Sequence, residues 1–243
     1  VLGRIGLAWS IAAVLYLNFG VKTRAAIAVA VLAGYGALSA LVAAPDAAGA
    51  GPLTFEGNLA GYIDRQFLPG KLIYGSFDPE GLLSTVPAVV TAMLGMFTGE
   101  FVRRGDIRGG RKTLWMAAAA AALLAAGLAF SGVLPVNKKL WSSTFVCVVG
   151  AYSLGMFALF YYLIDVRGWR RWTLFFRVVG LNSITIYLAQ RIVGFGRISD
   201  FFLGGIASKC PEAVAAVISS AGYVAVCWLF LYFLYRKNVF LKV

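Results

Sequence analysis

The most constraining feature of this sequence is a series of long apolar segments. A helix needs about 20 mostly apolar residues to cross the hydrocarbon core of a bilayer. Seven segments approach or reach that length: 2–19, 25–42, 82–102, 114–134, 145–164, 174–192 and 213–235. Because lipid offers no partners to backbone N–H and C=O groups, such segments are helical. We therefore predict an all-α integral membrane protein with about seven transmembrane helices in this chain, forming one polytopic domain over residues 1–243.

The composition agrees with this class of protein. Hydrophobic residues make up 60% of the chain and charged residues 13%, whereas soluble domains average about 45–50% and about 25%. The net charge of +12 would suit a nucleic-acid partner, but the basic residues flank apolar segments, as in the loops of membrane proteins. We expect a lipid bilayer as partner and no nucleic acid. The chain has no His, and its three Cys lack the spacing of a metal site, so we expect no metal.

The basic residues also predict the orientation of the chain. With seven spans, one side would hold eight of the 22 basic residues, namely Arg4, Arg65, Lys71, Lys138, Lys139, Arg191, Arg197 and Lys209. The side that includes the C-terminus would hold the other 14. Cytoplasmic loops carry the excess of Lys and Arg, so we predict a cytoplasmic C-terminus. The first helix then starts outside, and the long loop at about 43–81 also lies outside, where a loop of this length favours a function.

Two carboxylates precede the third apolar segment, in the sequence Asp78-Pro79-Glu80-Gly81. Carboxylates at a membrane surface could bind an amine or a hydroxyl group, or act as a base. The alternative is that they cap a helix, because acids at a helix N-terminus face the positive end of its dipole.

Further polar residues lie in the next outer loop and in the sixth segment. Asn137 and Lys138 could bind substrate hydroxyls or an anion, and Trp141 could stack on a sugar ring; alternatively Trp and Lys anchor the loop at the membrane interface. Asn182, followed by Ser183, lies near the middle of a span. It must face a cavity or bond another helix. We predict that Asp78, Glu80, Asn137, Lys138 and Asn182 converge on one cavity.

Basic residues at the inner ends of the first helices form a second candidate site. Lys22, Arg24, Arg103 and Arg104 could bind the phosphates of a cytoplasmic ligand through charge-assisted hydrogen bonds. The alternative is that they only mark the topology and contact lipid. Arg4, one turn into the first helix, must reach outward or meet a partner.

Five blocks of the sequence resemble the heparan-alpha-glucosaminide N-acetyltransferase family and its bacterial relatives. They are VLGRIGLAW (1–9), FDPEGLLSTVPAVVTAMLGMFTGE (77–100), PVNKKLWSSTF (135–145), YYLIDVRG (161–168) and FFRVVGLNSITIYL (175–188). Their order and spacing match the family over residues 1–188, although the loop at 43–76 adds nothing to the resemblance.

The resemblance implies an acyltransferase that uses cytosolic acetyl-CoA and acetylates a glucosamine-like amino sugar on the periplasmic face of a bacterial inner membrane. On this basis the acceptor site would use Asp78, Glu80, Asn137, Lys138, Trp141, Asn182 and Ser183. Acetyl-CoA would bind Arg4, Lys22, Arg24, Arg103 and Arg104. The family's catalytic His has no counterpart here, so we expect it upstream of Val1, in a protein of about ten transmembrane helices of which this chain is the C-terminal part. The resemblance also favours a homodimer.

Two other functions stay open from the sequence alone. A membrane transporter of small molecules or sugars would use Asn182 and Arg177 at a midplane site, although no internal repeat supports it. A non-catalytic membrane scaffold would need none of these polar groups for chemistry.

Overall fold

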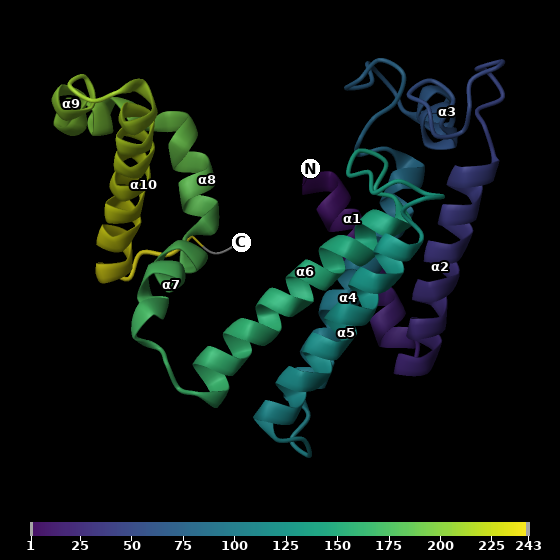
Figure 1. Cartoon of the computed structure of the whole chain (residues 1–243), viewed down its shortest axis with the longest axis horizontal. Helices are drawn as coiled ribbons and strands as arrows, with labels where there is room; N and C mark the ends of the chain where they lie inside the picture. Colours follow the sequence, from purple (N-terminus) through teal and green to yellow (C-terminus); the bar gives the residue numbers. More distant parts are fainter. Residues whose placement is uncertain (1, 242–243) are drawn as a thin grey trace. The chain divides into compact units, whose positions relative to one another are not determined.

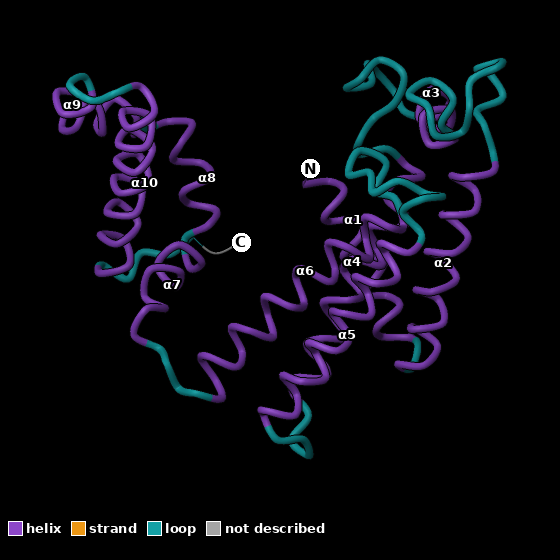
Figure 2. The backbone as a smooth tube through the Cα atoms, in the orientation of Figure 1, coloured by secondary structure: helices purple, strands orange, loops and turns teal. Residues whose placement is uncertain are grey.

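The computed structural model describes residues 2–241. Contacts within the chain divide it into two compact units, one ending at Arg167 and the other beginning at Gly168. The prediction of a single domain over residues 1–243 stays a prediction. Within the described residues the structure is helical apart from loops and one isolated antiparallel bridge between Ala43 and Asn58 (Figure 2). The predicted all-α membrane fold class is confirmed.

The first unit contains six α-helices. They are α1 (Leu2–Asn18), α2 (Val21–Leu41), α3 (Leu59–Phe67), α4 (Leu82–Arg103), α5 (Gly109–Ala129) and α6 (Ser143–Tyr161), and α6 continues into a π-helical turn, η1 (Tyr162–Val166) (Figure 1). The second unit contains a 3-10 turn, η2 (Arg171–Thr173), and four helices: α7 (Leu174–Leu181), α8 (Ser183–Ile192), α9 (Phe195–Ala207) and α10 (Glu212–Arg236).

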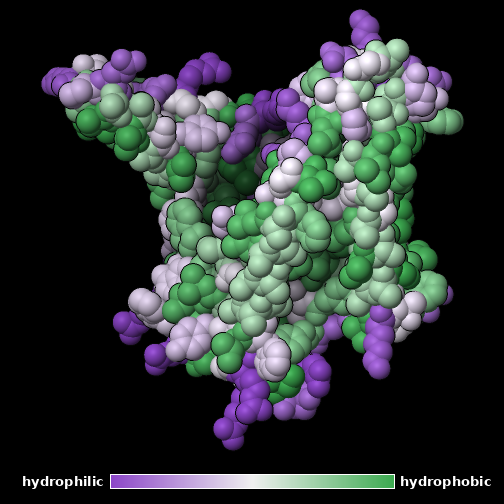
Figure 3. Space-filling view, turned by 45° about the vertical axis from the view of Figure 1, so that its right-hand side comes forward, coloured by the Kyte–Doolittle hydropathy of each residue, from purple (hydrophilic) through white to green (hydrophobic). Residues whose placement is uncertain are grey.

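Five helices of the described chain are long and apolar enough to cross a membrane: α2, α4, α5, α6 together with η1, and α10. Figure 3 shows hydrophobic residues along the sides of the helices and hydrophilic residues gathered at their ends, as a spanning arrangement requires. The helix α1 is also apolar but has only 17 residues.

The central helix of the first unit is α4. It contacts α1, α2, α3, α5 and α6 and is the most buried of the spanning helices. Its core face, from Ala88 to Met93, packs on Ala8 and Ala12 of α1 and on Val146 of α6. Small residues such as these alanines let helix backbones approach closely, which is how helices associate in lipid. This packing holds the first half of α4 against α1 and α6.

Polar contacts define two ends of the first unit. At one end, which we call the Arg4 end, lie Arg4 of α1, the start of α4 and the loop between α5 and α6. At the opposite end, the Arg24 end, Arg24 of α2 pairs with Glu100 of α4, and Lys112 of α5 donates to the carbonyl of Val102. This grouping follows the alternation of sides predicted for these helices. The cytoplasmic position of the C-terminus stays a prediction.

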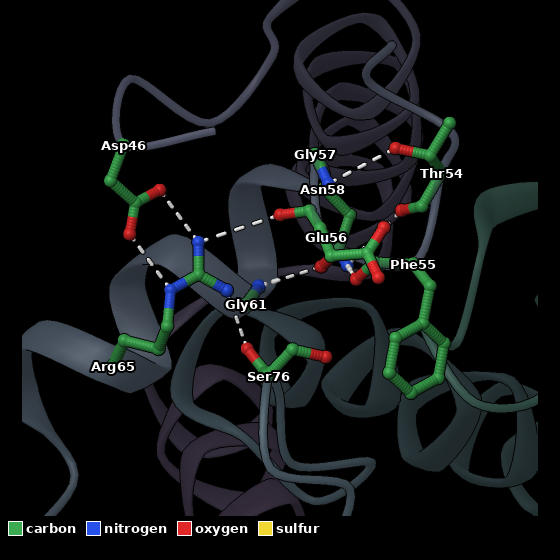
Figure 4. Close-up of polar contacts among 9 residues, drawn as sticks. All are labelled: Asp46, Thr54, Phe55, Glu56, Gly57, Asn58, Gly61, Arg65 and Ser76. Atoms are coloured by element: carbon green, nitrogen blue, oxygen red, sulfur yellow. Dashed lines mark hydrogen bonds and ion pairs between the residues drawn. The ribbon is translucent and has the colours of Figure 1, made fainter. Parts of the chain in front are cut away.

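The loop at 43–81 contains a short helix, α3, and folds around it. Asn58 caps this helix by accepting the backbone N–H of Gly61 at 2.6 Å. Arg65, near the helix end, donates to both carboxylate oxygens of Asp46 at 2.6 and 2.8 Å and to the carbonyl of Ser76 (Figure 4). The Arg65 guanidinium lowers the pKa of Asp46 below its ordinary value.

The structure corrects the sequence prediction in the second unit. The sixth predicted span, 174–192, is not one straight helix, because it breaks between α7 and α8 with a bend of 61°. Asn182 lies at the break, where its backbone leaves the helical conformation (φ −128°, ψ 28°). Two short helices, α3 and α9, were not predicted at all. The first predicted span, 2–19, is also shorter than expected, because α1 has only 17 residues. Among the described residues the count of about seven spans therefore becomes five, or six when the bent pair is one span.

Candidate functional site

The Arg4 end joins two sequence blocks that are far apart in the chain. Arg4 donates hydrogen bonds to the carbonyls of Pro79 and Ser84, at the start of α4. Its guanidinium carbon also lies 4.2 Å from the centre of the Trp141 ring, a cation–π contact. One side chain of α1 thus connects the turn that carries the two predicted carboxylates to the loop that carries the predicted tryptophan.

The turn at Asp78–Gly81 presents its two carboxylates differently. Asp78 accepts the backbone N–H of Glu80 at 2.8 Å and that of Ile73 at 3.4 Å, so its oxygens stabilise the turn. The capping alternative therefore describes Asp78 well. Glu80 lies on the same turn, next to Pro79, whose carbonyl Arg4 binds.

A third carboxylate, missed by the sequence analysis, lies beneath the same turn. Asp64 of α3 has no exposed surface, and it accepts the backbone N–H of Asp78 at 3.2 Å and that of Leu82 at 3.0 Å. Burial raises the pKa of Asp64, and these two hydrogen bonds act against that rise. An acid in a loop gives no sequence signal that it will reach a helix start 18 residues later.

The loop between α5 and α6 is held by its own side chains. Asn137 accepts the backbone N–H groups of Lys139 and Leu140 at 2.9 and 3.4 Å, so its amide oxygen forms a local turn. Lys139 lies 4.4 Å above the ring of Tyr74, while Lys138 is exposed. Asn137 and Lys138 therefore lie at the same end as Asp78 and Glu80, and their binding of a substrate stays a prediction.

Trp141 has an unusual backbone for a residue with a side chain, with φ at 52°. Such a conformation costs about 1–3 kcal/mol and persists only where the surroundings enforce it. Here the indole N–H donates to Thr91 of α4 at 3.2 Å, and the ring packs edge-on against Phe145 at 5.0 Å. With Arg4 on the ring as well, Trp141 is fixed from three helices.

Comparison with known proteins agrees with these blocks. The chain is 29% identical over 208 residues to the heparan-alpha-glucosaminide N-acetyltransferase of Homo sapiens, and 27% identical over 205 residues to that of Mus musculus. The chain is a distant relative of these acetyltransferases. In each case the match covers 77% of this chain and 30% of the relative, so the chain spans about a third of their length. No family model matches it.

The five cations predicted to bind the donor of this acetyltransferase relative do not form one cluster. Arg4 lies at the Arg4 end, whereas the other four cations lie at the Arg24 end. Arg24 is buried and engaged with Glu100 at 2.8 Å, and Arg104 pairs with Asp106 at 2.6 Å. Lys22 and Arg103 are exposed at the Arg24 end. Among the described residues no group of three His, Cys, Asp or Glu side chains could hold a metal ion.

Asn182 belongs to the second unit, so its predicted meeting with the carboxylates of the Arg4 end stays a prediction. Its side chain is 1% exposed. The amide oxygen accepts a hydrogen bond from Thr185 at 3.3 Å, whereas the amide nitrogen has no partner within the described chain. A buried donor without a partner costs about 1–3 kcal/mol, which makes Asn182 a candidate for ligand contact. Ser183 is exposed at the start of α8.

Proposed function

We propose that the protein is a transmembrane acetyltransferase, which transfers acetyl from cytosolic acetyl-CoA to an amino sugar on the periplasmic side of the membrane. The observation that carries the proposal is the joining of the Asp78–Gly81 turn and Trp141 by Arg4. Both blocks resemble the acetyltransferase family, and the two relatives bear the name of that activity.

The acceptor site in this proposal is the Arg4 end. A protonated sugar amine would be attracted by Glu80, which lies on the turn that Arg4 binds through the carbonyl of Pro79. Trp141 presents a large ring of fixed orientation beside it, suited to the apolar face of a sugar. Asn137 and Lys138, on the same loop, would contact ring hydroxyls. Asp78 serves this site by fixing the turn, because its oxygens are engaged by backbone N–H groups.

The donor side in this proposal is the Arg24 end. The phosphates of CoA carry several negative charges, and cations at a membrane surface attract such a ligand. Lys22 and Arg103 are exposed there and are the best candidates. Arg104 is a poorer candidate because it already pairs with Asp106. Arg24 is a poorer candidate because it is buried and pairs with Glu100.

The chemistry requires the amine to lose its proton before it attacks. The neutral nitrogen then adds to the acetyl carbonyl and the carbon–sulfur bond breaks. The nitrogen gives up its extra proton and the CoA sulfur gains one, so CoA leaves as a thiol. The base that removes the proton would be the His that the resemblance implies, outside these 243 residues. Asn137, Lys138 and Asn182 carry N–H donors of the kind that stabilise the oxyanion that develops on such a carbonyl, and the amide nitrogen of Asn182 has no partner within the described residues.

The test is transfer of labelled acetyl from acetyl-CoA to glucosamine by the intact protein in proteoliposomes. We expect Glu80→Gln to raise KM for the amine acceptor at least tenfold and to leave KM for acetyl-CoA unchanged. Asp106→Asn, an exposed carboxylate at the other end, is the matched control. Absence of transfer to any amino sugar would refute the proposal.

A second candidate function is transport, and the break between α7 and α8 favours it. Transporters often build midplane sites from interrupted helices, and Asn182 lies at such an interruption. Uptake of labelled sugar into proteoliposomes without acetyl-CoA would support transport. Uptake that requires acetyl-CoA and yields only acetylated sugar would support the transferase.

A further inference from the structure

Asp64 is the most deeply buried carboxylate of the Arg4 end. It has no exposed surface, although it comes from a short helix within a loop. Burying a carboxylate is costly unless it is hydrogen-bonded. The two N–H groups that Asp64 accepts belong to Asp78 and Leu82, one on each side of the turn that carries Glu80. The Asp64 carboxylate thus connects the two sides of this turn through the N–H groups of Asp78 and Leu82.

The turn is shaped to admit this carboxylate. A Cβ atom on Gly81 would lie 2.1 Å from one oxygen of Asp64 and 2.2 Å from the other, so any larger residue would displace the carboxylate. The backbone of Gly81 is ordinary extended chain (φ −64°, ψ 172°), which alanine adopts without strain. Close approach to Asp64, and not backbone freedom, is therefore what requires glycine at position 81.

Arg4 holds the same turn from the other direction. It binds the carbonyl of Pro79 within the turn and that of Ser84 in the first turn of α4. The N–H groups of the segment are thus fixed by an anion and its carbonyl groups by a cation. Glu80 lies between the two points that Asp64 holds, so its backbone has little freedom to move.

We propose that Asp64 is a positioning residue of the acceptor site: by holding the N–H groups of Asp78 and Leu82, it sets the place at which Glu80 presents its carboxylate to the substrate amine. This inference rests on the proposed function. Asp64 touches no substrate itself and acts through the turn. Catalysis is sensitive to such placement, because a misplacement of about 1 Å can lower a rate about 100-fold.

The first test compares Asp64→Asn with Asp46→Asn in the intact protein. The asparagine at position 64 has the shape of aspartate but only one acceptor oxygen, so one of the two bridging hydrogen bonds is lost. We expect kcat to fall at least tenfold and KM for the acceptor to rise, with KM for acetyl-CoA unchanged. Asp46 is in the same loop and binds only at the surface, so its variant should keep the wild-type constants. A variant at position 64 with a lower melting temperature but unchanged kcat and KM would show a structural role alone and overturn the proposal.

The second test uses the contact between Asp64 and Gly81. Gly81→Ala should displace the Asp64 carboxylate and reproduce the kinetic loss of Asp64→Asn. In an Asp64→Ala background the obstructing oxygens are gone, so the same alanine at position 81 should cause less than a twofold further loss. If the losses of the two single variants instead multiply in the double variant, the two residues act independently and the proposal is wrong.

A third measurement separates this inference from the proposed function. Hydrogen exchange of the amides of Asp78 and Leu82 reports the bridge whether or not acetyl transfer is observed. We expect both amides to be protected in the wild-type protein and at least tenfold faster in Asp64→Ala. Absence of acetyl transfer with protected amides would refute the function and leave the bridge standing. Unprotected amides in an active wild-type protein would refute the bridge.

Discussion

The ion pair between Arg24 and Glu100 gives the sharpest prediction about stability. The side chain of Arg24 is 7% exposed, and its guanidinium donates to Glu100 at 2.8 Å through a single nitrogen. Rings of Tyr16 and Phe97 lie 4.6 and 5.6 Å from it. The remaining nitrogens of this guanidinium and the second oxygen of Glu100 are buried with no partner in the described chain. The pair joins α2 to α4 at the Arg24 end.

The size of the effect follows from the partial burial of the pair. Two unit charges 4 Å apart attract with about 4 kcal/mol at an effective dielectric constant of about 20. The side chain of Glu100 is 32% exposed, and water screens part of this attraction, so we take about 2–3 kcal/mol for the coupling. Arg24→Met should therefore lower the free energy of unfolding by about 3 kcal/mol, because it also leaves Glu100 half-buried without its partner.

A double-mutant cycle checks this value. In the Glu100→Gln background, Arg24→Met should cost about 1 kcal/mol or less, since no buried charge is then left alone. The assay is reversible unfolding of the intact protein in mixed micelles, followed by tryptophan fluorescence. Equal costs in the two backgrounds would show that the charges are not coupled. If Arg24→Met weakened acetyl-CoA binding without lowering stability, Arg24 would belong to the donor site and not to a stabilising ion pair.

Three further outcomes are expected. Arg65 lowers the pKa of Asp46. The stability that this pair contributes is therefore present above the unfolded pKa of about 3.9 and is lost as the pH falls through the folded value. Asp46→Asn should remove this acid dependence from melting curves recorded between pH 3 and 7. Gly127→Ala should destabilise by about 1–3 kcal/mol, because its Cβ would come within 2.7 Å of a side chain of α6, while Gly132→Ala, in open space, should change the melting temperature little. Asn182→Leu should keep or raise the melting temperature, because it removes a buried donor without a partner, and should abolish acetyl transfer; full activity in that variant would exclude the amide from the site.

The apolar segments could be located from the sequence, but their continuity could not. Hydropathy alone places the ends of α2, α4, α5, α6 and α10 within five residues, because the requirement of the bilayer for apolar length is strong. It also marks 174–192 as apolar enough for a span, yet it does not show that the helix breaks at Asn182. The short helices α3 and α9 fall below any span criterion, and α3 depends on local signals such as its Asn58 cap.

The sequence could suggest residues of the candidate site, but it could not show how they are arranged. Asp78, Glu80 and Trp141 could be chosen for their chemistry, and the structure places them at one end of the first unit. What joins them is Arg4, 75 residues from the carbonyl that it binds. A contact at that separation leaves no periodicity or spacing in a single sequence. Asp64 was missed for the same reason, because its role depends on where α3 packs against the start of α4.

Residues at the two ends of α4 have different roles in the proposed function. The helix has 22 residues and therefore a length of about 33 Å at about 1.5 Å per residue, close to the thickness of the hydrocarbon core. Its first turn is held by Asp64 and Arg4, and its last turn by Arg24 through Glu100. In the proposed function the phosphates of CoA and the acceptor sugar therefore contact residues at opposite ends of this helix. Residues of the Arg4 end should accordingly affect the kinetic constants of the acceptor, and residues of the Arg24 end those of the donor. Because the same rigid helix carries both, a change at one end reaches the other only if α4 itself shifts.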